Sequence, residues 1–306
     1  MLKVVAVAIA WFAIGLFPVE AHGVAETARP VAAHLHWSFD PWLMLCLGLS
    51  GGVYAAGVAR LWRHAGRRRG VGAAQIAAFA AGWLAIIAAL VSPLDALADQ
   101  LFSAHMVEHE ILMIVAAPLL VLGRPLAVWI WALPAAWRGP IGALLHRPGW
   151  RVPWLLVTGP LWAWILHALA LWLWHVPALF RAALETQWIH DLQHISFLGT
   201  ALLFWWSVLG GASRRERGFA LLSLFTTMVH TGALGALLTL STRVWYPDYL
   251  DTAPAWGLSA LQDQQLGGIV MWVPAGIVYI VCGLVLMTRW LGDARGVAIR
   301  GRSGMA

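Results

Sequence analysis

The chain of 306 residues has only two cysteines, Cys46 and Cys282, and contains no Cys-x-Cys or Cys-x-x-Cys pair. The sequence therefore lacks the thiol pairs that a disulfide framework or a thiolate metal centre requires. Charge is also sparse: charged residues make up 11% of the chain, whereas hydrophobic residues make up 61%. A water-soluble globule of this length needs more polar surface, so the composition predicts a protein whose solvent is the lipid bilayer.

Apolar runs of at least 18 residues predict an all-α, polytopic membrane bundle of about seven transmembrane helices, since one span needs roughly 20 apolar residues. The runs cover residues 41–59, 71–91, 103–123, 154–175, 188–209, 219–241 and 267–289. The sequence shows no internal repeat and no low-complexity tract. A Trp-rich and Pro-rich stretch between the third and fourth runs, 125–153, is expected to lie at the membrane interface.

The net charge of +6 could suggest a nucleic-acid binder, but the basic residues occupy alternate short loops instead. Arginines concentrate at residues 60–69, 124–151, 214–217 and 295–302, whereas the loops at 92–102 and 242–266 are acidic. Basic loops remain in the cytoplasm, so the pattern predicts an amino terminus outside and a carboxyl terminus inside. We therefore expect a multi-pass protein of the bacterial inner membrane, in contact with lipid and with no nucleic-acid partner.

The amino-terminal segment resembles a signal peptide over residues 1–21, where Lys3 precedes a short apolar run and Val19-Glu20-Ala21 forms a cleavage-like site. An uncleaved first helix is the alternative. The expected organisation is a signal peptide at 1–21, a periplasmic segment at 22–40, a membrane domain at 41–290 and a cytoplasmic tail at 291–306.

Histidines gather at one level of the predicted bundle. His105 and His109 begin the third span and His190 and His194 begin the fifth, so each pair lies on one helix face, one turn apart. Imidazole suits copper, zinc, iron and nickel. Four such rings predict a metal or haem site between these two helices; alternatively, each histidine only caps a helix or bonds to a neighbouring helix.

Further side chains are candidates for the same site. His175, which closes the fourth span, and His230, in the middle of the sixth, are candidate deeper ligands, and His167 lies two turns deeper in the fourth span. Polar groups at the same level could orient the imidazoles. These expected supporting residues are Glu108, Asp191, Asp263 and Gln265.

Two weaker patterns also involve histidine. His105-Met-Val-Glu108-His109 fits the His-x-x-Glu-His motif of a zinc protease, with Glu108 as base and Glu185 as a further ligand. His34 and His36, with His22 at the start of a cleaved chain, could capture copper outside the membrane. A flexible segment that carries scattered histidines is the simpler interpretation of the second pattern.

Four stretches resemble the seven-helix CtaG-type proteins that assemble cytochrome c oxidase in bacteria. The first runs from His105-Met-Val-Glu-His109 through Ala116-Ala-Pro118 to Gly123-Arg-Pro125. The others are Trp174-His175-Val-Pro177-Ala-Leu-Phe180, then His190-Asp-Leu-Gln-His194 through Phe204-Trp205-Trp206, and Asp263-Gln-Gln265-Leu-Gly-Gly268 through Met271-Trp272-Val-Pro274. Together they extend over most of residues 100–290.

The resemblance implies a non-enzymatic assembly factor of a haem-copper oxidase, with oxidase subunits or other assembly factors as partners. Together with the histidine pattern, it suggests that the chain handles or delivers copper. A membrane protein that binds b-type haem, an intramembrane zinc protease and a scaffold without metal remain the alternatives.

Overall fold

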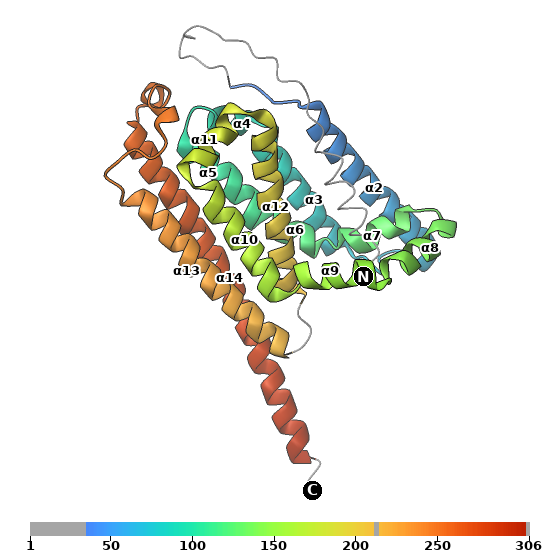
Figure 1. The fold of residues 1–306 in the computed structure, drawn as a ribbon. Coiled ribbons are helices and arrows are strands. Elements are labelled where there is room, and N and C mark those ends of the chain that lie inside the picture. The colour runs from blue at the N-terminus through green and yellow to red at the C-terminus, as the bar shows by residue number, and fades with distance from the viewer. Residues whose placement is uncertain (1–34, 211–213, 304–306) are drawn as a thin grey trace.

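The computed structural model describes residues 35–210 and 214–303, and this part of the chain consists of helices and their connections, with no strand (Figure 1). The expected signal peptide 1–21 and the candidate ligands His22 and His34 lie outside the described residues. Six helices are long and apolar enough to cross a membrane, and a bent pair of helices makes a seventh candidate. The predicted membrane bundle is confirmed, whereas the orientation of its termini stays a prediction.

The candidate spans follow the predicted apolar runs closely. Their bounds are α2 (Pro41–Ala65), α3 (Ala73–Leu90), the continuous segment α5 (Phe102–Glu110), η1 (Ile111–Ala116) and α6 (Ala117–Leu122), the bent pair α9 (Pro148–Val157) and α10 (Pro160–Trp174), α12 (Gln187–Leu209), α13 (Arg214–Thr239) and α14 (Ala260–Ser303).

Proline starts many of these helices. It occupies a first position in α2, α9, α10 and three shorter helices, where its missing N–H would have no intrahelical partner. These three shorter helices are α4 (Pro93–Ala98), α7 (Pro125–Ala132) and α11 (Pro177–Glu185). A further short helix, α8 (Ala135–Leu145), begins directly after Pro134, and the turns are η2 (Pro247–Tyr249) and η3 (Ala253–Trp256). In the structure, the predicted interfacial stretch 125–153 folds as α7, α8 and the first part of α9.

The fourth span is broken, although its apolar run is continuous. Helix α9 ends at Val157 and α10 begins at Pro160, with an angle of 62° between them. Pro160 disfavours a helical conformation of the preceding residue, and Gly159 adopts an extended one. Helix α10 alone, at 15 residues, reaches only about 22 Å by the usual rise per residue.

The third span is the central helix of the bundle. In its most apolar window 61% of residues are buried inside the protein, against 22% in α2, α3 and α14. Its middle, η1, is π-helical, and Pro118 follows at the start of α6. Because Pro118 cannot donate to the carbonyl of residue 114, a wider turn before it is a favourable accommodation. Residues on this segment are therefore shielded from lipid by neighbouring helices.

Candidate metal centre

The start of α5 is held by a carboxylate from the far end of the chain. Asp263 on α14 accepts hydrogen bonds from the backbone N–H groups of Phe102 (2.6 Å) and Ser103 (3.1 Å) and from Ser103 Oγ (2.5 Å). The first N–H groups of a helix have no intrahelical acceptor, and a negative charge there is favourable. Asp263 thus anchors the turn that carries His105.

Helices α5 and α12 bring their two histidine pairs together. The ring centroids of His105 and His109 are 4.4 Å apart and those of His190 and His194 are 4.3 Å apart. Between the helices, His105 lies 5.3 Å from His190 and His109 lies 5.3 Å from His194, centroid to centroid. The four imidazoles therefore share one level between α5 and α12.

His175, which follows the last residue of α10, adds a fifth ring. Its centroid lies 6.5 Å from that of His109. Its Nδ1 lies 2.6 Å from the carbonyl oxygen of Leu171, which can only accept, so Nδ1 carries the proton and Nε2 the lone pair. Such a backbone bond commonly orients a metal-binding histidine. We call His105, His109, His175, His190 and His194 the five-histidine cluster.

Potential ligand atoms converge in two overlapping groups. One atom from each of His105, His109 and His194 lies within 4.8 Å of the others, and the same holds for His105, Glu108 and His190. Glu108, which the sequence suggests as a residue that orients a ring or as a protease base, thus lies where its carboxylate could itself be a ligand. Cluster members from two helices and a carboxylate are a suitable donor set for a cation.

Many polar atoms of this region have no hydrogen-bond partner among the described residues. They include both ring nitrogens of His105 and His109, both carboxylate oxygens of Glu108, and Nε2 of His175, His190 and His194. Buried polar atoms are normally paired, since an unpaired one costs about 1–3 kcal/mol. A cation that takes up these lone pairs would remove that cost.

The cluster is less accessible than the sequence suggests. His105 and His109 are each 1% exposed, and only His190 is partly exposed. Phe180 packs 5.0 Å from His105, and Tyr246 packs 4.5 Å from Phe180, centroid to centroid. These aromatic rings close one side of the cluster, so His190 is the member that a solute would meet first.

Residues 52–293 match the model of the family described as cytochrome c oxidase caa3 assembly factor (Caa3_CtaG). The chain belongs to this family. The resemblance that the histidine-containing motifs carry is therefore confirmed, and the protein is a membrane-embedded member of the caa3 assembly factors.

Curated relatives of this family member come from mycobacteria. Uncharacterized proteins of Mycobacterium bovis and Mycobacterium tuberculosis are each 32% identical over 279 residues, covering 86% of this chain and 40% of the relative. An uncharacterized protein of Mycobacterium leprae is 28% identical over 277 residues, covering 86% and 41%. The caa3 assembly factor thus spans about two fifths of the length of these relatives. No solved structure matches it.

The other candidate residues of this caa3 assembly factor lie apart from the cluster. Asp191 is exposed and accepts a hydrogen bond from Gln187, and Gln265 donates to the carbonyl oxygen of Ser241. His230 packs 5.8 Å from Trp164, centroid to centroid, and belongs to neither ligand group in the described part of the chain. Glu185 is exposed and belongs to neither group of potential ligands among the described residues. The zinc-protease pattern therefore does not gain Glu185 as a further ligand.

The sequence patterns did not identify three polar residues that are functional candidates in the structure. Gln193 is fully buried beside His105, and Glu110 is 8% exposed, with one carboxylate oxygen that has no hydrogen-bond partner among described residues. Tyr246 donates a 2.8 Å hydrogen bond to the carbonyl oxygen of His175, and burial raises the pKa of Tyr246, so its hydroxyl keeps its proton. Gln193 and Glu110 were detectable as polar residues within apolar runs.

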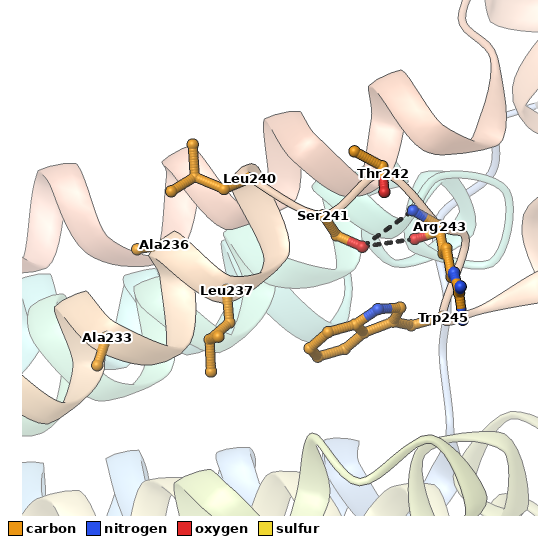
Figure 2. Close-up of a pocket in the computed structure, with 8 residues that line it drawn as sticks. All are labelled: Ala233, Ala236, Leu237, Leu240, Ser241, Thr242, Arg243 and Trp245. Carbon is orange, nitrogen blue, oxygen red and sulfur yellow. Dashed lines mark hydrogen bonds between the residues drawn. The ribbon is translucent and has the colours of Figure 1, made fainter.

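A separate groove lies at the end of α13 (Figure 2). Its apolar wall is formed by alanine and leucine side chains of the helix, and Arg243 and Trp245 lie across from it. The lining residues are Ala233, Ala236, Leu237, Leu240, Ser241, Thr242, Arg243 and Trp245. It contains no histidine or carboxylate, so it offers no alternative metal centre.

Proposed function

We propose that this caa3 assembly factor binds copper at the five-histidine cluster and releases it during assembly of the oxidase. The supporting observation is the convergence of buried, unpartnered imidazole nitrogens from α5, α10 and α12 with the Glu108 carboxylate. The protein acts as a carrier and not as an enzyme. Its partners are oxidase subunits or other assembly factors in the bacterial inner membrane, with the cluster near the outer face.

The donor set favours copper over a harder cation. Neutral imidazoles are good ligands for copper, whereas magnesium and calcium prefer oxygen. Neutral histidines, one Glu108 carboxylate and one cuprous ion together carry no net charge. A neutral assembly is favourable in a buried site because an isolated charge there is costly.

Release follows from the arrangement of the cluster. The ligand atoms fall into two overlapping groups that share His105, and His190 in the second group is partly exposed. An ion bound to the first group could therefore move to the second without losing His105. We expect the partner to take the ion at the His190 side, because His105 is screened by Phe180 and His109 by Phe197.

Copper stoichiometry of the purified full chain tests the proposal. Alanine substitution at His105, His109, His190 and His194 is expected to abolish binding at the cluster, whereas His64→Ala with His146→Ala, two exposed histidines, should leave it unchanged. Melting temperatures in detergent show whether each variant folds. Unchanged copper binding in a folded quadruple variant would remove the proposal.

The substitution Glu108→Gln distinguishes the proposed copper carrier from a metalloprotease. Losing the buried negative charge should weaken copper binding by about tenfold or more, as for other groups around a metal. A protease predicts that metal stays bound while function is lost. The visible spectrum of the purified protein addresses haem directly, since bound b-type haem absorbs strongly and a copper carrier with imidazole ligands does not.

A further inference from the structure

The groove at the end of α13 has an apolar part and a basic part (Figure 2). Leu237 on its wall is 50% exposed and belongs to the candidate membrane span Arg215–Thr239, and Leu240, directly after that span, is 78% exposed. Arg243 and Trp245 line the groove from the connection that follows. The groove therefore extends from the level of the lipid hydrocarbon to that of the headgroups.

The guanidinium of Arg243 has no hydrogen bond or ion pair within residues 35–210 and 214–303. Arg181, at the same end of the bundle, is by contrast paired with Asp248, 3.3 Å from Nε to a carboxylate oxygen. The residues that line the groove include no carboxylate that could pair with Arg243 instead. An exposed guanidinium beside an apolar surface is complementary to a phosphate that carries hydrocarbon.

Two glutamines of α14 hold the basic part of the groove in place. Gln264, which is 1% exposed, donates to the carbonyl oxygen of Arg243 (3.1 Å) and accepts from the backbone N–H of Trp245 (2.6 Å). Gln265 donates to the carbonyl oxygen of Ser241 (3.0 Å). The backbone that carries Arg243 and Trp245 is thus fixed before a ligand arrives, which lowers the entropy cost of binding.

The chemistry of the groove selects one class of membrane lipid. Its volume of about 530 Å³ is in the usual range of small-molecule pockets and accommodates a headgroup phosphate with part of one acyl chain. A zwitterionic headgroup would bring an ammonium for which the lining residues offer no carboxylate. A phospholipid whose charge is that of its phosphate matches the single cation, Arg243. The ring of Trp245 suits the boundary between headgroup and hydrocarbon.

We propose that this groove binds an anionic phospholipid of the surrounding bilayer. The phosphate pairs with Arg243, and an acyl chain lies along Ala233 and Leu237 of α13. The lipid holds the connection after α13 in its observed conformation, in which Tyr246 donates a 2.8 Å hydrogen bond to the carbonyl oxygen of His175. This inference does not depend on the proposed copper binding.

Native mass spectrometry and melting temperatures of the full chain in detergent micelles test the lipid site. Added phosphatidylglycerol should remain bound to the unmodified protein and raise its melting temperature, because a ligand that binds only the folded state stabilises it. Phosphatidylcholine should do both to a smaller extent. Arg243→Gln should weaken phosphatidylglycerol binding by about fivefold, the usual contribution of one basic residue near a membrane surface.

Three variants serve as matched comparisons. Arg151→Gln removes an exposed arginine from α9, towards the other end of the bundle, and should leave phosphatidylglycerol binding unchanged. Ala233→Phe places a ring in the apolar part of the groove and should reduce lipid binding although Arg243 is intact. Val229→Phe, at a 53% exposed position one turn earlier and outside the groove, should not.

Several outcomes would overturn the lipid site. They are unchanged phosphatidylglycerol binding in folded Arg243→Gln and Ala233→Phe variants, equal loss in Arg151→Gln and Arg243→Gln, and equal retention of phosphatidylcholine. Stabilisation by glycerol phosphate as large as that by phosphatidylglycerol would show that no acyl chain is bound, and would also overturn it. Arg243→Lys, which keeps the charge, should retain most of the binding, and melting temperatures without lipid show whether each variant folds.

Discussion

Asp263 and Ser103, 160 residues apart in the chain, are joined by two hydrogen bonds, from the backbone N–H and from the hydroxyl of Ser103. With the bond from Phe102, the carboxylate is satisfied three times in a buried position. The interaction ties α14 to the first turn of α5, directly before His105. Asp263, which the sequence predicts to support the candidate metal site, thus acts in the structure on the helix that carries His105 and His109.

Asp263→Ala is expected to lower stability by about 2 kcal/mol or more, because it removes a helix cap and leaves buried donors without an acceptor. It should also weaken copper binding at the cluster, since the start of α5 is no longer held. Melting temperature and copper affinity measure the two effects. Asp251→Ala, an exposed carboxylate of the same connection, is the control; equal effects of the two substitutions would argue against the cap.

Gly268 allows α13 and α14 to approach closely. A Cβ at this position would lie 2.5 Å from Thr239 Oγ1 and 2.7 Å from the carbonyl oxygen of Gly235, closer than side chains tolerate. We expect Gly268→Ala to destabilise the protein by about 1–3 kcal/mol through overpacking. Small residues at such crossings are typical of membrane bundles.

Gly276 on the same helix is the matched control for Gly268. A Cβ there meets nothing within 4 Å. Because alanine favours a helix over glycine by about 0.5–1 kcal/mol, Gly276→Ala should leave the melting temperature unchanged or raise it slightly. A fall in the melting temperature of the same size in both variants would contradict the close approach at Gly268.

We expect the stability of the protein to depend on pH through Asp99. Desolvation beside the neighbouring helices and the negative charge of Asp95, one turn earlier, raise the pKa of Asp99 from 3.8 to about 6, and His36 opposes the shift. The folded state thus binds more protons than the unfolded state between these values, so this contribution to stability falls as pH rises from about 4 to 6. Asp99→Asn removes the penalty of the charged form.

The difference in melting temperature between Asp99→Asn and the unmodified protein measures this effect. We expect the variant to be the more stable at pH 7.5 and the difference to shrink towards pH 4.5. Asp251→Asn, in the connection between α13 and α14, is the control and is expected to show no such trend. A difference for Asp99→Asn that does not change with pH would contradict the raised pKa.

The membrane spans could be predicted because the bilayer imposes a length and a composition that a single segment reveals. The fourth span shows the limit of this reasoning: the apolar run is continuous, but Gly159-Pro160 bends the chain by 62°. Proline in a membrane helix is tolerated where neighbours satisfy the freed backbone groups. Sequence alone does not show whether such neighbours are present.

The histidine pairs at 105/109 and 190/194 could be predicted to meet, because helical periodicity sets their face and the limits of the spans set their depth. The sequence did not show that Glu108 lies among the potential ligands. It also did not show that His230 lies in a different part of the bundle, beside Trp164. Both depend on how each helix is rotated about its axis, and that rotation comes from packing against several neighbours at once.

The amino-acid sequence by itself determined that this chain is a bundle of membrane helices and which residues stand at the level of its histidines, because hydrophobic length and helical spacing are local properties. Only the tertiary structure decided which of those side chains face one another, how deeply they are buried, and that Asp263 holds α5. These features arise from contacts between segments far apart in the chain, whose relative rotation and closeness no single segment encodes.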